Sequence, residues 1–559
     1  MTEKLSWLIL SEKFISDGDP ESMCGAAEEI FELEKNSADG FAILAESALY
    51  LKNLDDAENF AKKSLSVEKN NLRAKLVLGG ISSEKFLLKD EIRIFSEVIA
   101  ESKKILENLT NEDEIFLTKK ILFRALCWIS NGFYLAGDPI SAANSLNEAS
   151  GLADKKIFAA ELYSKHLFLR NYREISADDS KKLAEKYNNF FDEIKTFTHN
   201  KKISQNKKLK IGYISPDFRQ HAAANFFMPF LKYFDAKKFS VTCYQIGKKD
   251  FVTEKFKKNK ISWRDLSGKN IQQSAEIIYK DKIDILVDFS GHSQNNALPI
   301  LAYKPAPIQI SAIGYTSTTG LNAVDYFFSN KNYGGFTEKI LPLKNFLCYS
   351  PIQKMPDAGI VAPVLKNNFV TFGSFNNFSK VTDEILSAWK KILESVENSR
   401  LVIKSKICSI EQGREILTER LEKINFPLEK IKLSPYSKNY LEEYKEIDIA
   451  LDTFPYTGGA TTCEAIFMGV PVISLCGKTH GENFSASILK SANLSELIAE
   501  NFSDYIKKAV ELGRNKNLIS DYHKNLREKI LQSDLTDEEK YMQDVEKIYS
   551  GFKFYTGVS

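Results

Sequence analysis

Residues 450–475, ALDTFPYTGGATTCEAIFMGVPVISL, decide how the sequence is best interpreted. An apolar run ends near Thr453 and is followed by a loop that contains Gly458 and Gly459. A helical stretch begins near Ala460 and leads into a second apolar run, PVISL. A strand, a helix and a strand in this order predict two parallel strands joined by a crossover helix. The question for function is what the loop before the helix binds.

The same alternation of short apolar runs and helical stretches continues from about residue 208 onward. Eight runs resemble buried strands. The expected strands are LKIGYIS (209–215), FSVTCYQI (239–246), IDILVDF (283–289) and IQISAIGY (308–315) in one sheet, and FVTFGSF (369–375), SRLVIKS (399–405), IDIALDT (447–453) and PVISL (471–475) in a second. Helical stretches are expected at 219–233, 272–280, 382–395 and 410–424.

Strands that alternate with helices predict doubly wound parallel sheets. We therefore expect two Rossmann-like domains that face a cleft, an N-terminal one at 208–351 and a C-terminal one at 368–535, and a final helix within 536–559. The polar run 198–208 is a candidate hinge, and the segment 352–368, rich in proline and glycine, is a candidate joint between the sheets.

Residues 1–200 have the apolar spacing of helices throughout, so we expect an all-helical domain. Large and small residues fall where a helical repeat of about 34 residues places its packing positions, and the segment resembles a tetratricopeptide repeat. These residues are Phe41, Leu44, Ala45, Ala48, Ala57, Ala61 and Ser64, with a degenerate copy at Leu126, Ile129, Ser130, Phe133, Ala142, Leu146 and Ala149. Such an array forms a curved solenoid whose concave side commonly binds polypeptide. The alternative is a helical cap that packs on the next domain.

Composition narrows the class of protein. The 76 basic and 74 acidic residues nearly cancel, which argues against nucleic acid or an anionic membrane as the main partner. The seven cysteines are scattered and odd in number, as expected for reduced thiols in a cytoplasmic protein. No apolar run approaches the ~18 residues of a membrane span, and we expect no membrane segment.

The loop of residues 450–475 has the features of an anion site. Gly458 and Gly459 allow a close backbone approach, and the helix that follows leaves its first amides without intrahelical partners. Thr461 and Thr462 can add hydroxyl donors to a phosphate, and Glu464 can accept hydrogen bonds from a ribose diol. The alternative is a helix start that binds no ligand.

Two further strand ends offer chemistry at the same edge of their sheets. FGSFNNFSK delivers Asn377 and Lys380 at a strand-to-helix junction, and a lysine there suits a diphosphate. ISPDFRQH brings His221 to the first turn of the expected helix, where it is either a proton-handling group or a residue that caps the helix. Among the other histidines only His292 is expected near the cleft, and no metal-ligand spacing occurs, so we expect a site without a metal.

Five blocks of sequence, in order, resemble those of the protein O-GlcNAc transferase family, glycosyltransferase family 41, which also holds bacterial cytoplasmic N-glucosyltransferases of adhesins. The blocks are LKIGYISPDFRQH, LVDFSGH, YKPAPIQISAIGYTSTTGLNAVDYFFSN, FGSFNNFSK and LDTFPYTGGATTCEAIFMGVPVISLCGKTHGENFSASIL. The resemblance covers roughly residues 208–550, with tetratricopeptide-like helices upstream as in the family.

The resemblance implies a GT-B architecture with an inverting, metal-independent transfer from a UDP-sugar. Lys380 stands where the family has its diphosphate lysine, Asn377 where many members have glutamine, and His221 at the sugar and acceptor side. Thr461 and Thr462 correspond, within one position, to the family's paired threonines, and Glu464 to its ribose-binding carboxylate, usually aspartate.

Two positions depart from the family pattern. Gly459 replaces a histidine of animal members. Tyr440 replaces a histidine that contacts the nucleotide in many members, with Lys438 as another phosphate or uracil contact. The GGATT form is closer to the bacterial transferase branch.

The sequence therefore predicts a cytoplasmic protein glycosyltransferase that moves GlcNAc or another hexose, from UDP-GlcNAc or UDP-glucose, to Ser, Thr or Asn side chains of an acceptor protein or peptide. His221 is the residue expected to take the acceptor proton, with a phosphate oxygen or a water chain as alternatives. The rival hypotheses are a UDP-sugar epimerase or hydrolase of the same fold, and a repeat scaffold without activity.

Overall fold

A computed structural model describes residues 3–199, 208–259 and 261–552, so most of the candidate hinge at 198–208 lies outside the described residues. The chain forms two compact units. The first comprises Met1–His166 and Ile410–Glu419, and the second comprises Leu167–Ser409 and Arg420–Ser559. The helical stretch expected for 1–200 continues to Phe190, but its contacts after His166 belong to the second unit.

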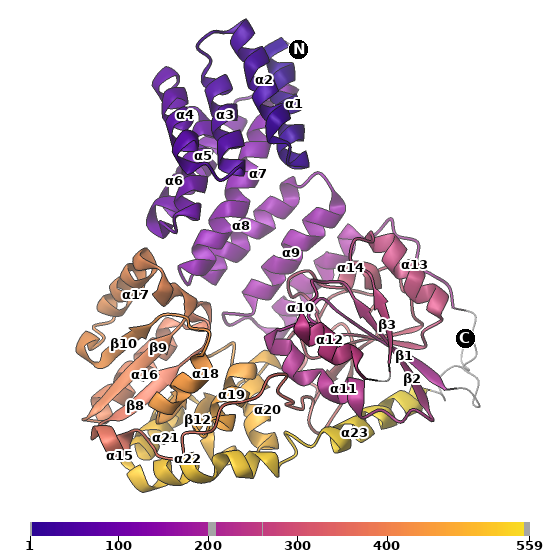
Figure 1. Cartoon of the computed structure of the whole chain (residues 1–559), viewed down its shortest axis with the longest axis vertical. Helices are drawn as coiled ribbons and strands as arrows, with labels where there is room; N and C mark the ends of the chain where they lie inside the picture. The colour runs from indigo at the N-terminus through magenta and orange to yellow at the C-terminus, as the bar shows by residue number, and fades with distance from the viewer. Residues whose placement is uncertain (1–2, 200–207, 260, 553–559) are drawn as a thin grey trace. The chain divides into compact units, whose positions relative to one another are not determined.

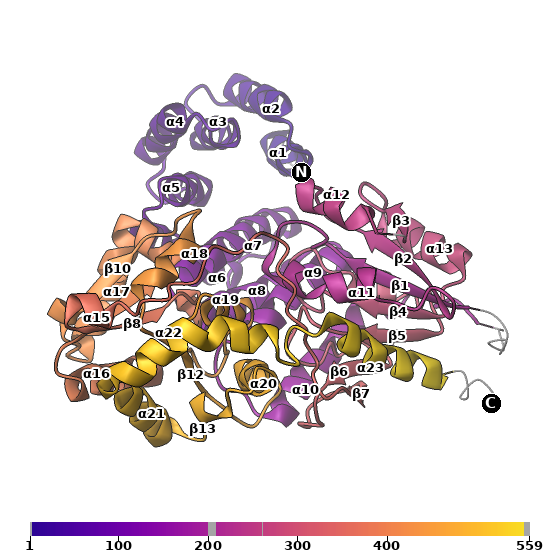
Figure 2. The same cartoon turned by 60° about the horizontal axis from the view of Figure 1, so that its bottom comes forward.

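The first unit is an array of antiparallel helix pairs, which Figure 2 shows as helices that follow one another around an arc. Its helices are α1 (Glu3–Asp17), α2 (Pro20–Leu33), α3 (Ala38–Tyr50), α4 (Leu54–Val67), α5 (Leu72–Glu84), α6 (Leu88–Leu106), α7 (Glu112–Leu135) and α8 (Pro139–Leu152). Asp19 and Asn53, 34 positions apart, each accept a backbone N–H at the start of α2 and α4. The helical repeat is confirmed.

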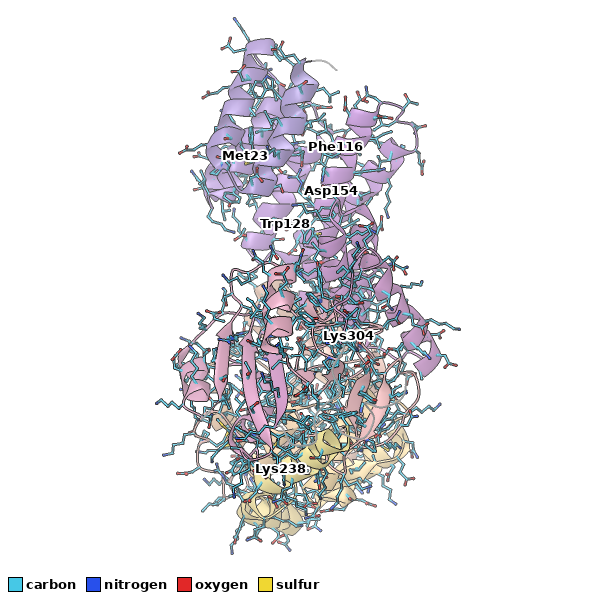
Figure 3. The ribbon with its side chains drawn as sticks, turned by 90° about the vertical axis from the view of Figure 1, so that its right-hand side faces the viewer. Met23, Phe116, Trp128, Asp154, Lys238 and Lys304 are labelled. Carbon is cyan, nitrogen blue, oxygen red and sulfur yellow. The ribbon has the colours of Figure 1, made fainter. Side chains whose placement is uncertain are left out.

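Small buried residues let the helices of each pair pack closely. Ala45, Ala57 and Ala61 form one core between α3 and α4. Trp128, labelled in Figure 3, packs its ring 5.8 Å from that of Phe95 between α6 and α7.

A second kind of contact joins the odd-numbered helices of the array. Glu12 of α1, Glu46 of α3, Arg73 of α5 and Arg124 of α7 form a network that we call the four-charge cluster. Arg73 Nη1 lies 3.0 Å from Glu46 Oε2, and Arg124 Nη2 lies 3.2 Å from Glu12 Oε1. Arg73 also pairs with Glu12, and Arg124 with Glu46. These side chains are buried or nearly so, and they connect α1 with α7 across the inner face of the array.

The second unit contains two parallel sheets, drawn in Figure 1 with their helices beside them. The first sheet has the order β3-β2-β1-β4-β5-β6-β7. Its strands are β1 (Leu209–Ser215), β2 (Phe239–Gln245), β3 (Ser262–Asp265), β4 (Ile285–Asp288), β5 (Ile308–Ser311), β6 (Tyr326–Ser329) and β7 (Lys339–Pro342). Lys304, labelled in Figure 3, pairs with Asp325 at 2.6 Å and joins the segment before β5 to the residue that precedes β6.

The second sheet has the order β10-β9-β8-β11-β12-β13. Its strands are β8 (Val370–Ser374), β9 (Ser399–Lys404), β10 (Ile431–Ser434), β11 (Ile449–Leu451), β12 (Val472–Leu475) and β13 (Ile498–Ala499). In both sheets the strand order reverses in the middle, between β1 and β4 and between β8 and β11. Such switch points are where doubly wound sheets bind ligands, outside the carboxyl ends of the strands.

Helices connect the strands of the two sheets in the second unit. They are α9 (Lys156–Arg170, shared with the first unit), α10 (Ala177–Glu185), α11 (Met228–Lys232), α12 (Phe251–Lys257), α13 (Ile271–Asp281), α14 (Leu298–Leu301), α15 (Val364–Asn367), α16 (Asp383–Ser395), α17 (Glu411–Lys423, also shared), α18 (Tyr440–Glu443), α19 (Ala460–Phe467), α20 (Phe484–Ser491), α21 (Phe502–Arg514), α22 (Lys516–Leu531) and α23 (Glu538–Gly551). Short 3₁₀ helices include η1 (Lys186–Phe190), η2 (Ala222–Phe226) and η3 (Phe378–Lys380).

One helix of the prediction is wrong. The stretch 219–233 is not a single helix but the two short helices η2 and α11. Pro229 lies at the first turn of α11, where a missing N–H costs nothing, whereas within a continuous helix it would break a hydrogen bond. His221 is consequently the N-cap of η2 rather than a residue of the first helical turn.

The last helix, α23, packs against the side of the first sheet. Figure 2 shows α22 beside the second sheet and α23 reaching the first, where the Tyr541 ring lies 5.5 Å from that of Phe230. Within residues 3–199, 208–259 and 261–552, no helix combines the length and apolar character needed to cross a membrane.

Candidate active site

The loop after β11 gathers hydroxyl groups at the start of α19. Gly459 is the N-cap residue, and since it has no side chain it leaves the first amides of the helix open to another partner. Thr461 Oγ1 donates to Asn376 Oδ1 at 3.0 Å, and Thr462 Oγ1 lies 2.9 Å from Ser485 Oγ. The structure thus brings both predicted threonines to the switch point of the second sheet.

Gly458 makes this arrangement sterically feasible. A Cβ atom there would lie 2.4 Å from Thr462 Oγ1, 2.8 Å from Thr461 Oγ1 and 3.0 Å from Asp452 Oδ1. The Gly458 N–H donates to the same Asp452 oxygen at 2.8 Å. Only glycine lets the loop pass this close to three oxygen atoms.

Lys380 ends η3, which follows β8, and therefore stands on the other side of the same switch point. Its Nζ lies 3.5 Å from Asn376 Oδ1 and 3.4 Å from Thr457 O, both at the outer limit of hydrogen bonding, and 4.5 Å from the centre of the Tyr456 ring. Burial lowers the pKa of Lys380 to about 8, and the charge of Asp452 opposes that change. Lys380 is partly buried, and its contacts within the part of the chain that the structure describes are long, which favours a ligand that supplies negative charge.

Two asparagines precede η3, and the structure gives them different surroundings. Asn377, the predicted site residue, is exposed, and its Oδ1 caps η3 by accepting a backbone N–H at 3.1 Å. Asn376 is buried and faces the site: its Oδ1 accepts from Thr461 and Lys380, and its Nδ2 donates to Asp452 Oδ1 at 3.3 Å. Sequence reasoning missed Asn376, since an NN pair in a loop does not show which residue points inward.

Glu464 is buried one turn into α19. Its Oε1 accepts the hydroxyl of Tyr440 at 2.7 Å. Burial raises the pKa of Glu464 to about 7, and the Tyr440 hydrogen bond opposes that rise. Tyr440 therefore orients the predicted ribose-binding carboxylate. Lys438, two residues earlier, is exposed.

On the first sheet, His221 follows β1 at the corresponding switch point. Its Nδ1 lies 3.5 Å from Asp217 Oδ2 and 3.3 Å from the backbone N of Ala223. Burial lowers the pKa of His221, with the Asp217 charge opposing and the Arg219 charge assisting. The imidazole is thus favoured in its neutral form, the state that can accept a proton.

The model for glycosyl transferase family 41 matches residues 162–339 and 361–545. This chain belongs to glycosyltransferase family 41. The family predicted from the ordered sequence blocks is confirmed.

Several curated proteins that are similar to this chain are named as transferases of N-acetylglucosamine to peptides. The Solanum lycopersicum protein called "Probable UDP-N-acetylglucosamine--peptide N-acetylglucosaminyltransferase SPINDLY" is 33% identical over 425 residues, which are 73% of this chain and 43% of that protein. The Arabidopsis thaliana protein of the same name is 36% identical over 360 residues, or 61% of this chain and 39% of that protein. The chain spans less than half the length of these relatives.

A solved structure has a similar fold over the length of this chain. The O-GlcNAc transferase of Thermobaculum terrenum, solved as a mutant, matches 100% of this chain and 99% of its own with a TM-score of 0.70 at 22% identity. The expected architecture of helical repeats followed by two Rossmann-like domains, the GT-B fold, is confirmed.

In this family 41 chain, residues that sequence reasoning missed lie next to the site. The end of α9 and the turn after it reach the second sheet: Arg173 Nη1 donates to Ser379 O at 2.9 Å, and the Tyr172 ring lies 4.7 Å from that of Tyr456. Asn171 Nδ2 donates to the hydroxyl of Tyr315 at 2.8 Å. A cleft between the loops of the two sheets is lined by Asn171, Arg173, Thr316, Ser317, His480 and Gly481.

His292 does not share the environment of His221. Its Nε2 lies 2.8 Å from Thr319 O, and its ring packs between those of Tyr187 and Tyr315. It therefore contacts the loop 314–320 at Tyr315 and Thr319.

Proposed function

We propose that this chain is an inverting, metal-independent protein glycosyltransferase that transfers GlcNAc or another hexose from a UDP-sugar to Ser or Thr, or Asn, side chains of a protein. The observation that carries the proposal is the partly buried, weakly bonded ammonium of Lys380, which meets the first turn of α19 at the Asn376 amide, while α19 has no side-chain cap. The names of the family 41 relatives support the donor and the acceptor class. The scattered, odd cysteines support a cytoplasmic location.

The proposed chemistry begins with the leaving group. When the bond between the sugar and the diphosphate breaks, negative charge develops on UDP. Lys380 and the first amides of α19 are positioned to stabilise that charge, as a metal ion does in other enzymes. The hydroxyls of Thr461 and Thr462 add donors, and the Glu464 carboxylate accepts from the ribose. Loss of one such preorganised donor typically costs about 10²–10³ in rate.

The acceptor must also lose a proton as it attacks the anomeric carbon from the opposite face. His221 is suited to this step in one tautomer only. With a proton on Nδ1 facing Asp217, Nε2 carries the lone pair that accepts the proton. In the other tautomer Nδ1 accepts the N–H of Ala223 and Nε2 is itself protonated. The structure contains the second arrangement, so the proposed step requires the Nδ1 proton to turn to Asp217, 3.5 Å away, in place of the Ala223 bond.

The test is incubation of the purified chain with UDP-GlcNAc or UDP-glucose and a cell lysate, followed by intact-protein mass spectrometry of labelled proteins. A hexose or N-acetylhexosamine increment on a protein, lost in Lys380→Ala, is the expected result. Altered free sugar without labelled protein would establish an epimerase or hydrolase instead. Calorimetry with UDP, GDP, ADP and CDP tests which nucleotide the site prefers. Binding of none of them supports the scaffold hypothesis. Tighter binding of another nucleotide than of UDP refutes the UDP part of the proposal.

A further inference from the structure

Strand β11 carries a buried carboxylate at each end, Asp448 before it and Asp452 after it. Asp448 accepts the backbone N–H groups of Val364 and Thr371, each at 2.8 Å. It ties the start of the strand to neighbouring backbone. Asp452 lies where the loop to α19 begins. The two residues match in burial and in their relation to the strand, and they differ in what surrounds them.

Asp452 accepts hydrogen bonds on both carboxylate oxygens. Oδ1 accepts from Thr453 N (2.9 Å), Gly458 N (2.8 Å) and Asn376 Nδ2 (3.3 Å), and Oδ2 accepts from Ser474 Oγ (2.7 Å). Since each of these partners is a donor, the contacts fit the ionised carboxylate, which only accepts. Burial raises the pKa of Asp452, and the hydrogen bonds and the Lys380 charge oppose that rise.

The Asp452 carboxylate is linked to Thr461 and Lys380 by way of the Asn376 side chain, which contacts all three residues. An amide presents donors on its nitrogen and acceptors on its oxygen. Because Asp452 takes the nitrogen, Asn376 must turn its oxygen toward Thr461 and Lys380, as observed at 3.0 Å and 3.5 Å. Asp452 thus sets which way the amide faces.

We propose that Asp452 is a positioning residue of the donor site: its carboxylate orients the Asn376 amide, fixes the Gly458 loop and is the buried counter-charge of Lys380. The inference rests on the proposed function, since it concerns the same diphosphate-binding groups. Asp452 acts through these neighbours rather than by contact with the nucleotide.

The pH dependence of nucleotide binding distinguishes a counter-charge from a purely structural residue. The titratable groups around this pair are the phenols of Tyr456, whose ring faces Lys380, of Tyr505, which donates to Asp452 O at 2.9 Å, and of Tyr444. Burial raises the pKa of Tyr444 and of Tyr505, with a smaller contribution from the Asp452 charge, and this keeps both phenols neutral near pH 8. Burial lowers the pKa of Lys380 to about 8, so this ammonium titrates in the range that the experiment covers.

The experiment compares UDP affinity, by calorimetry, of the wild-type chain and Asp452→Asn at pH 6.5 and pH 8. If loss of the carboxylate lowers the Lys380 pKa from about 8 to roughly 7, the charged fraction falls roughly five-fold at pH 8 and less than about 1.5-fold at pH 6.5. The titration of UDP itself cancels in the ratio of the two proteins. The expected result is a ratio that grows with pH, and a ratio equal at both pH values would overturn the inference.

Asp448→Asn is the matched control, because it removes a buried carboxylate from the other end of the same strand. It is expected to lower stability without any pH-dependent change in the affinity ratio. If Asp452→Asn does not fold, Asp452→Ser, which also removes the carboxylate charge, is compared with the wild type in the same way, and an affinity ratio equal at pH 6.5 and pH 8 overturns the inference. Absence of UDP binding to the wild type at every pH would overturn the proposed function as well.

Discussion

The substitution Gly458→Ala tests whether the oxygen atoms around the donor loop leave room for glycine alone. The new methyl group would lie 2.4 Å from Thr462 Oγ1 and 2.8 Å from Thr461 Oγ1. Real Cβ atoms essentially never approach other atoms this closely, so both threonines or the loop must move. The φ angle of Gly458 is not positive, so the expected cost comes from the close contacts of the new methyl group and not from backbone strain.

The magnitude follows from the contacts. Overpacking a buried site costs about 1–3 kcal/mol, and rotation of Thr462 away from Ser485 loses a hydrogen bond worth about 0.5–1.5 kcal/mol. We expect a loss of about 2–4 kcal/mol in the free energy of unfolding of the second unit. We also expect at least a tenfold loss of UDP affinity, since both threonine hydroxyls are displaced from the proposed phosphate position.

Gly459→Ala is the matched control one residue away. Its Cβ would meet only the Phe484 ring, at 3.0 Å and 3.5 Å, and that ring can turn aside. We expect a cost of about 1 kcal/mol or less. Urea unfolding gives the stability and calorimetry gives the affinity. Equal UDP affinity of Gly458→Ala and the wild type would refute the assignment of this loop to the donor site.

Three further outcomes are expected. Asn376→Ala should weaken UDP binding at least five-fold whereas the exposed Asn377→Ala should stay within about two-fold, by calorimetry, and the reverse order would contradict the placement of the two amides. The folded-state pKa of Glu464 is about 7, above its ordinary value of 4.5, so the folded state binds this proton more tightly than the unfolded state does. The free energy of unfolding should therefore fall by up to about 1.4 kcal/mol per pH unit as pH rises from 4.5 to 7. Glu464→Gln should flatten this slope in urea unfolding, and an unchanged slope would contradict the raised pKa of Glu464. Arg73→Met should cost about 3–5 kcal/mol because it leaves buried carboxylates underpaired, against less than about 1 kcal/mol for Lys103→Met on the surface; equal melting temperatures would disprove a stabilising cluster.

The central strands of both sheets could be predicted from sequence because each is an apolar run long enough to recognise. Each of the eight expected runs contains a strand, and these are β1, β2, β4, β5, β8, β9, β11 and β12. The edge strands were missed, since a strand exposed on one side need not be apolar: β3 reads SWRD and β10 reads IKLS. β6, YFFS, is buried on three of its four residues, but it is short and follows no clear turn signal.

The candidate site was predictable where its chemistry is local. Gly458, Thr461 and Thr462 lie within five residues of one another, and glycine before a helix start has a direct physical meaning. Residues whose role depends on distant contacts were not predictable: Asn376 meets Asp452 across 76 positions, and Arg173 reaches Ser379 across 206. Their roles are visible only once the sheets have folded.

The four-charge cluster has a consequence for how this helical array can change over evolutionary time. Open repeat arrays lengthen or shorten by whole repeats, because each repeat contacts only its neighbours. Here Glu12 of α1 pairs with Arg124 of α7, 112 positions away, so that insertion or deletion of a repeat between them would separate partners that are buried together. The number of helices from α1 to α7 is therefore fixed by electrostatics, and the four charged positions are expected to vary together or not at all.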